Sequence, residues 1–214
     1  MKTDLKLRPG PKDALIVVDV QNDFCPGGRL AVPKGDEIVP LVNALAGHFE
    51  NVVLTQDWHP AGHLSFATSH PGRKPFDSVK LPYGGQMLWP DHCLQGLDGA
   101  ALHKGLSIPQ AQLVIRKGWH KNVDSYSAFL EADRKTRTGL EGYLRERGIK
   151  RVFICGLATD FCVAWTALDA RKLGFAAVVI EDACRAIDDR GSLDSAWKKM
   201  KKAGVTRAGS GDFA

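Results

Sequence analysis

The 214-residue chain contains no apolar run long enough to cross a membrane. Its first residues, MKTDLKLRPGPKD, also lack the apolar core of a signal peptide. The five cysteines are irregularly spaced and include no Cys-x-x-Cys pair, which argues against a disulfide framework and favours free thiols in a reducing compartment. We therefore expect a cytoplasmic protein that makes no contact with a membrane.

The chain also lacks a strong excess of charge of one sign. Its formal net charge is only +5, and Lys and Arg are spread along the sequence apart from one cluster, Lys-Lys-Met-Lys-Lys at 198–202. No aromatic stacking pattern or recognition motif accompanies this cluster, so it indicates the solvated face of a helix rather than a nucleic-acid surface. We expect no nucleic-acid partner.

Neither an internal repeat nor a linker divides the sequence, and its length fits a single α/β domain over residues 1–214. Residues 1–12 are expected to form an N-terminal tail or an edge contact. Short apolar runs predict strands near 13–20, 52–56, 112–116, 151–155, 176–180 and 205–207. Amphipathic stretches predict helices near 36–49, 125–131, 138–147, 160–173 and 192–203. This alternation predicts a mainly parallel central sheet with helices on both faces.

One long stretch, residues 67–86, is rich in Gly, Pro and basic residues and has little regular pattern. A loop of this length in a compact domain is often a lid, a binding element or an interface. We interpret it as a wall over the active site, with a plain surface excursion as the alternative.

A cysteine stands where a buried strand turns sharply into a helix, in the stretch Ile-Cys-Gly-Leu-Ala-Thr-Asp-Phe-Cys-Val at 154–163. Thr159 and Asp160 are residue types that cap helix N-termini. The first turn of a helix offers unpaired N–H groups and a positive dipole end, which favour a thiolate and can hold an oxyanion. Cys162 is therefore a candidate nucleophile, although a buried core cysteine has the same pattern.

Two further strands end in charged residues. Asp19 stands near the end of the apolar run 13–20, and Lys117 follows the run Leu113–Arg116. Each alone is more often a solvated loop or cap residue. In open α/β sheets, however, ligands lie outside the carboxyl ends of the strands, where Asp19, Lys117 and Cys162 would meet.

Carboxylate and imidazole groups are clustered after another strand. Asp57, His59 and His63 lie within seven residues, and His92 follows in Trp-Pro-Asp-His-Cys at 89–93. Such ligands suit zinc, iron or manganese, and a set with open positions is typical of catalytic or substrate-binding metals. Surface histidines in a loop are the alternative.

Together these motifs resemble the nicotinamidase/pyrazinamidase branch of the isochorismatase-like cysteine hydrolases. The resemblance rests on DVQNDFCPGG (19–28 with Asp19 first), TQDWHP (55–60), WPDHC (89–93), Lys117-Gly118 and GLATDFCV (156–163). It extends from about residue 13 to about residue 210, in the family's order. The cysteine segment and DVQNDF indicate only the superfamily, whereas the Asp-x-His and Trp-Pro-x-His-Cys elements indicate nicotinamidases. The implied fold is a three-layer α/β/α domain.

The resemblance implies a function, which is hydrolysis of nicotinamide to nicotinate and ammonia in NAD salvage, with pyrazinamide as a further substrate. Cys162 would form a thioester, Asp19 would exchange protons and Lys117 would hold both in register. The backbone N–H groups of Ala158 and Cys162 would form the oxyanion hole, and the Leu157–Ala158 bond is a cis peptide in the family.

The resemblance also implies one divalent metal ion, zinc first and iron or manganese as alternatives, held by Asp57, His59 and His92. The pyridine nitrogen of the substrate would take an open position on this ion. His63 is an additional ligand in some relatives, and Ser65 would contact a metal-bound water. The implied substrate-binding residues are Phe24, Trp89, Tyr126 and Leu157.

Other functions remain open at this point. A related cysteine hydrolase acting on a carbamoyl or ureido compound would share Asp19, Lys117 and Cys162 but has no need of the metal set. An isochorismatase commonly lacks the cysteine, and a binding module without turnover predicts a broken triad. The sequence leaves the oligomeric state open, with a homo-oligomer as one alternative.

Overall fold

Six of the apolar runs form one central sheet in a computed structural model that describes residues 7–213. Its strands are β1 (Asp13–Val18), β2 (Asn51–Asp57), β5 (Leu113–Lys117), β6 (Arg151–Leu157), β7 (Ala176–Arg185) and β8 (Thr206–Ala208). All neighbouring strands in this sheet are parallel, and β1 and β2 are buried along their whole length. Continuous apolar strands are expected where helices cover both faces. The predicted parallel α/β fold is confirmed.

The strand order is β5-β2-β1-β6-β7-β8, so the direction of winding reverses between β1 and β6. Chain segments leave the carboxyl ends of β1 and β6 in opposite directions at such a point, which opens a crevice there. The segments after these two strands carry Asp19 and Cys162. The topology therefore places both residues at the edge where ligands bind in this class of sheet.

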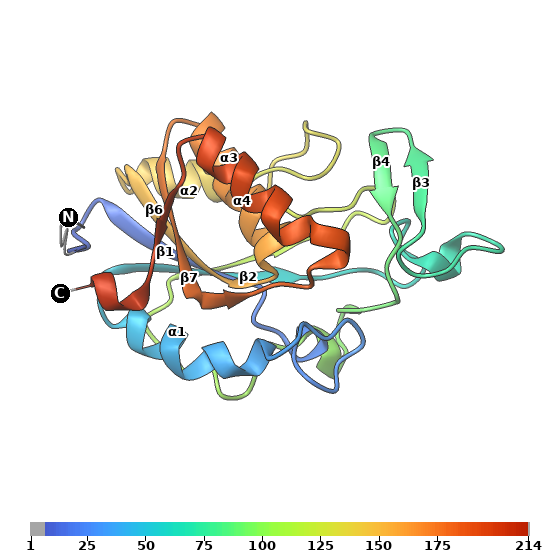
Figure 1. Cartoon of the computed structure of the whole chain (residues 1–214), viewed down its shortest axis with the longest axis horizontal. Coiled ribbons are helices and arrows are strands. Elements are labelled where there is room, and N and C mark those ends of the chain that lie inside the picture. Colours follow the sequence, from blue (N-terminus) through green and yellow to red (C-terminus); the bar gives the residue numbers. More distant parts are fainter. Residues whose placement is uncertain (1–6, 214) are drawn as a thin grey trace.

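Within residues 7–213 four α-helices cover the sheet, namely α1 (Val39–Ala46), α2 (Leu140–Glu146), α3 (Ala164–Lys172) and α4 (Ser192–Lys202). Figure 1 shows α1 on one face and the other three on the opposite face. In α4 the side chains of Ala196 and Met200 are buried, while the lysines of the basic cluster point to solvent. The cluster is thus a solvated helix face, as the sequence indicates.

The predicted helix at 125–131 is wrong, because its main-chain groups are taken by side chains. The Ser125 carbonyl accepts a hydrogen bond from Lys117 Nζ at 2.9 Å. The Phe129 N–H, which would bond to that carbonyl in a helix, donates instead to Ser127 Oγ at 3.1 Å. Serine side chains compete with helical hydrogen bonding in this way.

The stretch 67–86 has more structure than the sequence suggests. It contains a 3-10 turn (Ala67–Ser69) and most of an antiparallel hairpin formed by β3 (Ser78–Leu81) and β4 (Gly84–Met87). The hairpin stands at the end of the molecule away from both termini (Figure 1). Its strands are half-exposed and only four residues long, so the alternation of polar and apolar residues in β3 (Ser-Val-Lys-Leu) is too short to mark a strand.

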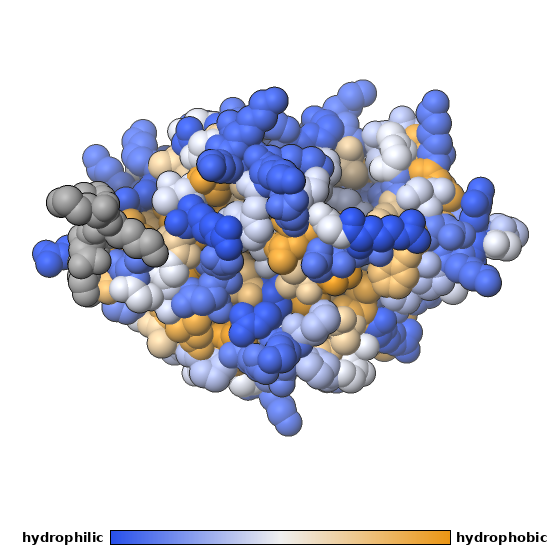
Figure 2. Space-filling model, viewed as in Figure 1, coloured by the Kyte–Doolittle hydropathy of each residue, from blue (hydrophilic) through white to orange (hydrophobic). Residues whose placement is uncertain are grey.

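The first and last of the described residues meet at one edge of the fold. Leu7 forms a parallel bridge to Phe213, and its N–H donates to the Asp212 carbonyl at 2.6 Å. Residues 7–12 thus include the expected edge contact, whereas the rest of the predicted tail, residues 1–6, lies outside the described residues. Hydrophilic side chains cover most of the face in Figure 2, with apolar ones in smaller areas between them. Among residues 7–213 no helix is long and apolar enough to cross a membrane.

Gly156, the last residue but one of β6, lets the main chains of β6 and β1 approach closely. Its φ is +117°, and a Cβ atom built on it would lie 2.1 Å from the Val18 carbonyl oxygen. The pairing of β6 with β7 shifts register at the same position. The end of β6 is thereby pressed against the end of β1, which draws the residues after both strands together.

We expect Gly156→Ala to destabilise the protein by about 2–4 kcal/mol, because the added Cβ meets main-chain atoms that cannot move aside and the φ is strained. Gly142→Ala on α2 is the control, since its Cβ meets nothing within 4 Å and alanine stabilises a helix by about 0.5–1 kcal/mol. Thermal unfolding of the two variants measures the difference. An unchanged midpoint for Gly156→Ala would contradict the packing argument.

Candidate active site

Asp19 begins the site directly after β1, where its φ of +48° turns the chain out of the strand. Its side chain is fully buried. Thr55 of β2 holds it from two sides, because the Thr55 hydroxyl donates to Asp19 Oδ1 at 2.6 Å and accepts from the Asp19 N–H at 3.1 Å. Burial raises the pKa of Asp19, and the nearby Asp57 carboxylate adds to this effect against the opposing charge of Lys117. Asp19 is thus oriented and more basic than an exposed aspartate.

Lys117, the last residue of β5, connects the charged groups of the site. Its buried Nζ lies 2.7 Å from Asp57 Oδ1 and 2.9 Å from Asp19 Oδ2. The Cys162 Sγ atom lies 3.4 Å away. Burial alone would lower the pKa of Lys117, but the two carboxylates hold it well above its ordinary value. The ammonium is therefore a fixed positive charge between two carboxylates and the thiol.

Cys162 lies in a π-helical turn (Thr159–Val163) that joins β6 to α3. The predicted preference for thiolate is wrong for the free site, because burial raises the pKa of the thiol well above its ordinary value. The Asp19 and Asp57 charges act in the same direction, and Lys117 only partly opposes them. Burial thus favours the protonated thiol, and the Lys117 ammonium that contacts Cys162 Sγ also contacts Asp19, the carboxylate that can take the thiol proton.

The predicted capping role of Thr159 and Asp160 is also wrong. Ala158 stands at the N-cap position without a capping side chain. The Asp160 carboxylate instead accepts hydrogen bonds from the N–H groups of Ile187 and Asp188, at 3.1 and 2.9 Å, and from the Ser192 hydroxyl. Asp160 thus fixes the segment between β7 and α4. The Leu157–Ala158 peptide is cis, as the resemblance implies.

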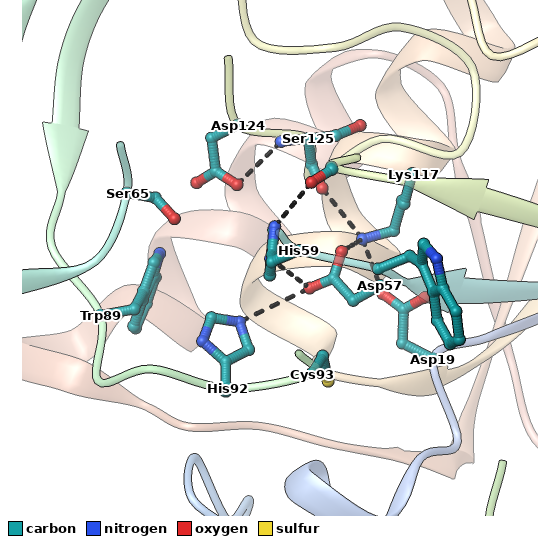
Figure 3. Close-up of polar contacts among 12 residues, drawn as sticks. Asp19, Asp57, His59, Ser65, Trp89, His92, Cys93, Lys117, Asp124 and Ser125 are labelled. Carbon is teal, nitrogen blue, oxygen red and sulfur yellow. Dashed lines mark hydrogen bonds and ion pairs between the residues drawn. The ribbon is translucent and has the colours of Figure 1, made fainter. Parts of the chain in front are cut away.

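Asp57, His59 and His92 present three ligand atoms within 4.8 Å of one another. Asp57 Oδ2 lies 3.3 Å from His59 Nε2 and 3.6 Å from His92 Nε2 (Figure 3). The Nδ1 atoms of both rings lie 2.8 Å from main-chain carbonyls, those of Gly118 and Pro90, so Nδ1 carries the proton in each ring.

Three lone pairs therefore face one another, two from Nε2 atoms and one from the Asp57 carboxylate. Burial would raise the pKa of Asp57, but the Lys117 charge beside it holds the pKa well below its usual range. An ionised carboxylate with two oriented imidazoles is a donor set that fits a divalent cation, and hydrogen bonds from Nδ1 to carbonyls are the usual support of such ligands. The residues present fit the implied metal.

His63 and Ser65 lie beside this set but engage each other. His63 Nδ1 lies 2.8 Å from Ser65 Oγ, and its Nε2 lies 3.0 and 3.1 Å from the carbonyls of His120 and Val123. Burial and the neighbouring His59 lower the pKa of His63 to about 4, so its ring is neutral. His63, Asp124 and His59 also bring ligand atoms within 4.8 Å. Both ring nitrogens of His63 are nevertheless used in protein hydrogen bonds, so the structure does not join it to the Asp57 set.

Cys162 and two members of the metal-ligand set, Asp57 and His92, line the same pocket. It is lined by Phe24, Leu30, Asp57, Trp89, His92, Asp124, Tyr126, Ala158, Phe161, Cys162 and Ile187. The aromatic residues predicted from the motifs, Phe24, Trp89 and Tyr126, are among them. Leu157 is not, because its side chain is fully buried in the core beside Gly35.

Sequence reasoning missed several lining residues. Asp124 is buried, and its Oδ2 accepts from Gln86 of the β3–β4 hairpin at 2.7 Å. Gln86 Nε2 also donates to the Tyr126 hydroxyl at 3.1 Å, so the hairpin packs behind two lining residues, Asp124 and Tyr126. None of residues 67–86 is among those that line the pocket, so the interpretation of this stretch as a wall over the site stays a prediction. Phe161 precedes Cys162 and could have been found from that motif. Ile187 has no local signal, because only the hydrogen bonds to Asp160 place it at the pocket.

The chain matches the model of the isochorismatase domain over residues 13–210. It is 58% identical to a nicotinamidase of Acinetobacter baylyi over 207 residues, 97% of each chain, and 45% identical to that of Escherichia coli over 92% of this chain and 94% of the relative. The protein belongs to the isochorismatase family, in its nicotinamidase branch.

Solved structures agree with this assignment. An Acinetobacter baumanii nicotinamidase/pyrazinamidase superposes with a TM-score of 0.94 at 61% identity, covering 95% of this chain and 98% of the other. The pyrazinamidase of Pyrococcus horikoshii in complex with zinc superposes with a TM-score of 0.75 at 36% identity, covering 93% and 99%. The family is one of hydrolases, and the chain is an enzyme of this class.

We expect Thr55→Val to destabilise the protein by about 1–3 kcal/mol, because a buried Asp19 oxygen loses its donor. Thr68→Val is the matched control, since the Thr68 hydroxyl also donates to an aspartate, Asp91, but at the exposed surface. Its cost should stay within about 0.5 kcal/mol. Denaturant unfolding measures both, and Thr55→Ser should stay close to wild type. Equal losses for the two valine variants would contradict the role of Thr55.

Proposed function

We propose that the protein is a nicotinamidase that hydrolyses nicotinamide to nicotinate and ammonia, in NAD salvage. The observation that carries the proposal is the position of Lys117, whose ammonium contacts Asp19, Cys162 and the metal-ligand set at once. Yeast nicotinamidase has been solved with the inhibitor nicotinaldehyde, and a relative from L. infantum with nicotinate. Pyrazinamide, also a small ring carboxamide, is a further substrate in this proposal.

In the proposed mechanism Cys162 attacks the carboxamide carbon while Asp19 takes the thiol proton. The raised pKa of the thiol makes a base necessary, and the raised pKa of Asp19 makes this carboxylate a suitable one. The N–H groups of Ala158 and Cys162 hold the resulting oxyanion. Asp19 then delivers the proton to the departing ammonia and activates a water molecule that hydrolyses the thioester. Lys117 keeps its charge throughout and holds Asp19 and the sulfur in register.

In this proposal the metal-ligand set, and not Cys162, orients the substrate. A divalent ion held by Asp57, His59 and His92 would supply, when bound, an open coordination position for the ring nitrogen of the substrate. Zinc is proposed first, because of the zinc-bound pyrazinamidase, with iron and manganese as alternatives. Phe24 and Trp89 line the same pocket as Asp57, His92 and Cys162, and in this proposal they hold the substrate ring.

We expect Cys162→Ala to abolish ammonia release from nicotinamide without unfolding the protein, because the nucleophile is lost and only one sulfur atom is removed. Cys184→Ala is the control, since Cys184 is also buried but lies outside the pocket. A coupled ammonia assay and thermal unfolding measure the two effects. Turnover by Cys162→Ala near that of wild type would refute the mechanism. No turnover by wild type loaded with metal would favour a related hydrolase with another substrate.

We expect a strong chelator to reduce turnover, and added zinc, manganese or iron to restore it, because the substrate loses and regains its anchor. The loss should appear mainly as a raised KM for nicotinamide. His92→Ala should not be rescued by added metal, whereas the exposed His48→Gln should behave like wild type. Turnover indifferent to chelation would leave the cysteine chemistry in place and remove the metal from the proposal.

A further inference from the structure

The side chain of Gln21 contacts the main chain of the site residue Asp57 rather than its carboxylate. The Gln21 side chain is fully buried. Its Oε1 accepts from the Asp57 N–H at 2.8 Å, and its Nε2 donates to the Asp57 carbonyl at 2.9 Å. The same Nε2 donates to the Ala100 carbonyl, also at 2.9 Å. Each polar atom of this carboxamide is thus engaged, and both polar groups of the Asp57 backbone are held by one side chain.

These hydrogen bonds lie just beyond the point where the pairing of β1 with β2 ends. The pairing of β1 with β2 ends at Val17 and Leu54, because the chain turns out of β1 at Asp19. On the other side β2 remains paired with β5 as far as Asp57 and Lys117. The Asp57 backbone therefore has a strand neighbour on one side only. A carboxamide offers the donor and acceptor of a peptide group, so the Gln21 side chain replaces the missing strand.

Asp57 is the residue whose position most affects the site. One carboxylate oxygen contacts Lys117 at 2.7 Å, and the other faces the Nε2 atoms of His59 and His92. A rotation of its backbone would move the carboxylate relative to all three partners. Partners that orient a ligand typically change metal affinity by about 10–100-fold when they are removed.

We propose that Gln21 is a positioning residue for the metal site, which sets the affinity for a divalent cation by fixing the backbone of Asp57. The inference deepens the proposed function and rests on its metal set. Gln21 itself touches neither the cation nor the substrate pocket. Its side chain joins the segment that carries Asp19 to the strand that carries Asp57, so one residue keeps the two carboxylates in fixed relation.

Gln56 provides a matched control for a merely structural role. It is a buried glutamine adjacent to Asp57, and its Nε2 donates to the same Ala100 carbonyl at 2.8 Å. Its Oε1 accepts from Arg116 Nε at 3.1 Å rather than from Asp57. Gln56→Met therefore removes a comparable buried amide without releasing the backbone of Asp57.

The experiment measures Zn²⁺ affinity by competition with a chromophoric chelator, for metal-free wild type, Gln21→Met, Gln21→Glu and Gln56→Met, well below their unfolding temperatures. Both Gln21 variants should bind Zn²⁺ about 10–100-fold more weakly than wild type, and Gln56→Met within about threefold of it. Gln21→Glu keeps the size of the side chain but lacks the two N–H donors. If Gln21→Met does not fold, Gln21→Glu alone tests the proposed role of Gln21.

The inference is overturned if both Gln21 variants bind Zn²⁺ like wild type, if Gln56→Met loses as much affinity, or if wild type binds no Zn²⁺. Nicotinamide turnover is measured in parallel and separates the two proposals. Wild type that binds Zn²⁺ tightly but releases no ammonia refutes the proposed reaction, while the Zn²⁺ affinities of the variants still decide the role of Gln21.

Discussion

The site depends on one buried ammonium group. Removing the Lys117 charge from water costs several kcal/mol, and its contacts with Asp19 and Asp57 offset that cost. The same two carboxylates could not both be buried and ionised without the cation between them. Because Asp57 also faces the histidines, the ammonium links the nucleophile end of the pocket to the metal-ligand end. The contacts that balance the buried charges are therefore also the contacts that set the geometry of the site.

The surrounding structure supports that arrangement by side chains rather than by the sheet alone. The strands diverge beyond Val17 and Leu54, which opens the crevice but removes the strand ladder where precision is needed. Thr55 then holds Asp19, and Gln21 holds the Asp57 backbone. Buried polar groups of this kind are costly when unsatisfied, so they define one arrangement of the site.

Much of the fold and site could be predicted from local pattern. Continuous apolar runs mark the buried parallel strands, and charged residues at their ends mark the crevice. The helix expected at 125–131 does not form, because the Ser125 carbonyl accepts a hydrogen bond from Lys117. The amphipathic pattern of the segment cannot reveal this contact. The thiolate expected at Cys162 failed for a similar reason, since the helix terminus was visible in the sequence but the burial and the adjacent Asp19 were not.

The sequence by itself determined the parallel α/β class, the order of the motifs and the residue types that reach the site, because these follow from periodicity and from the chemistry of short segments. Tertiary structure alone decided which groups exchange a proton, form an ion pair or form a hydrogen bond with one another. The contacts of Gln21 with Asp57 and of Asp160 with Ile187 join residues 36 and 27 positions apart. Such pairings depend on burial and on the meeting of distant strands, which no local pattern encodes.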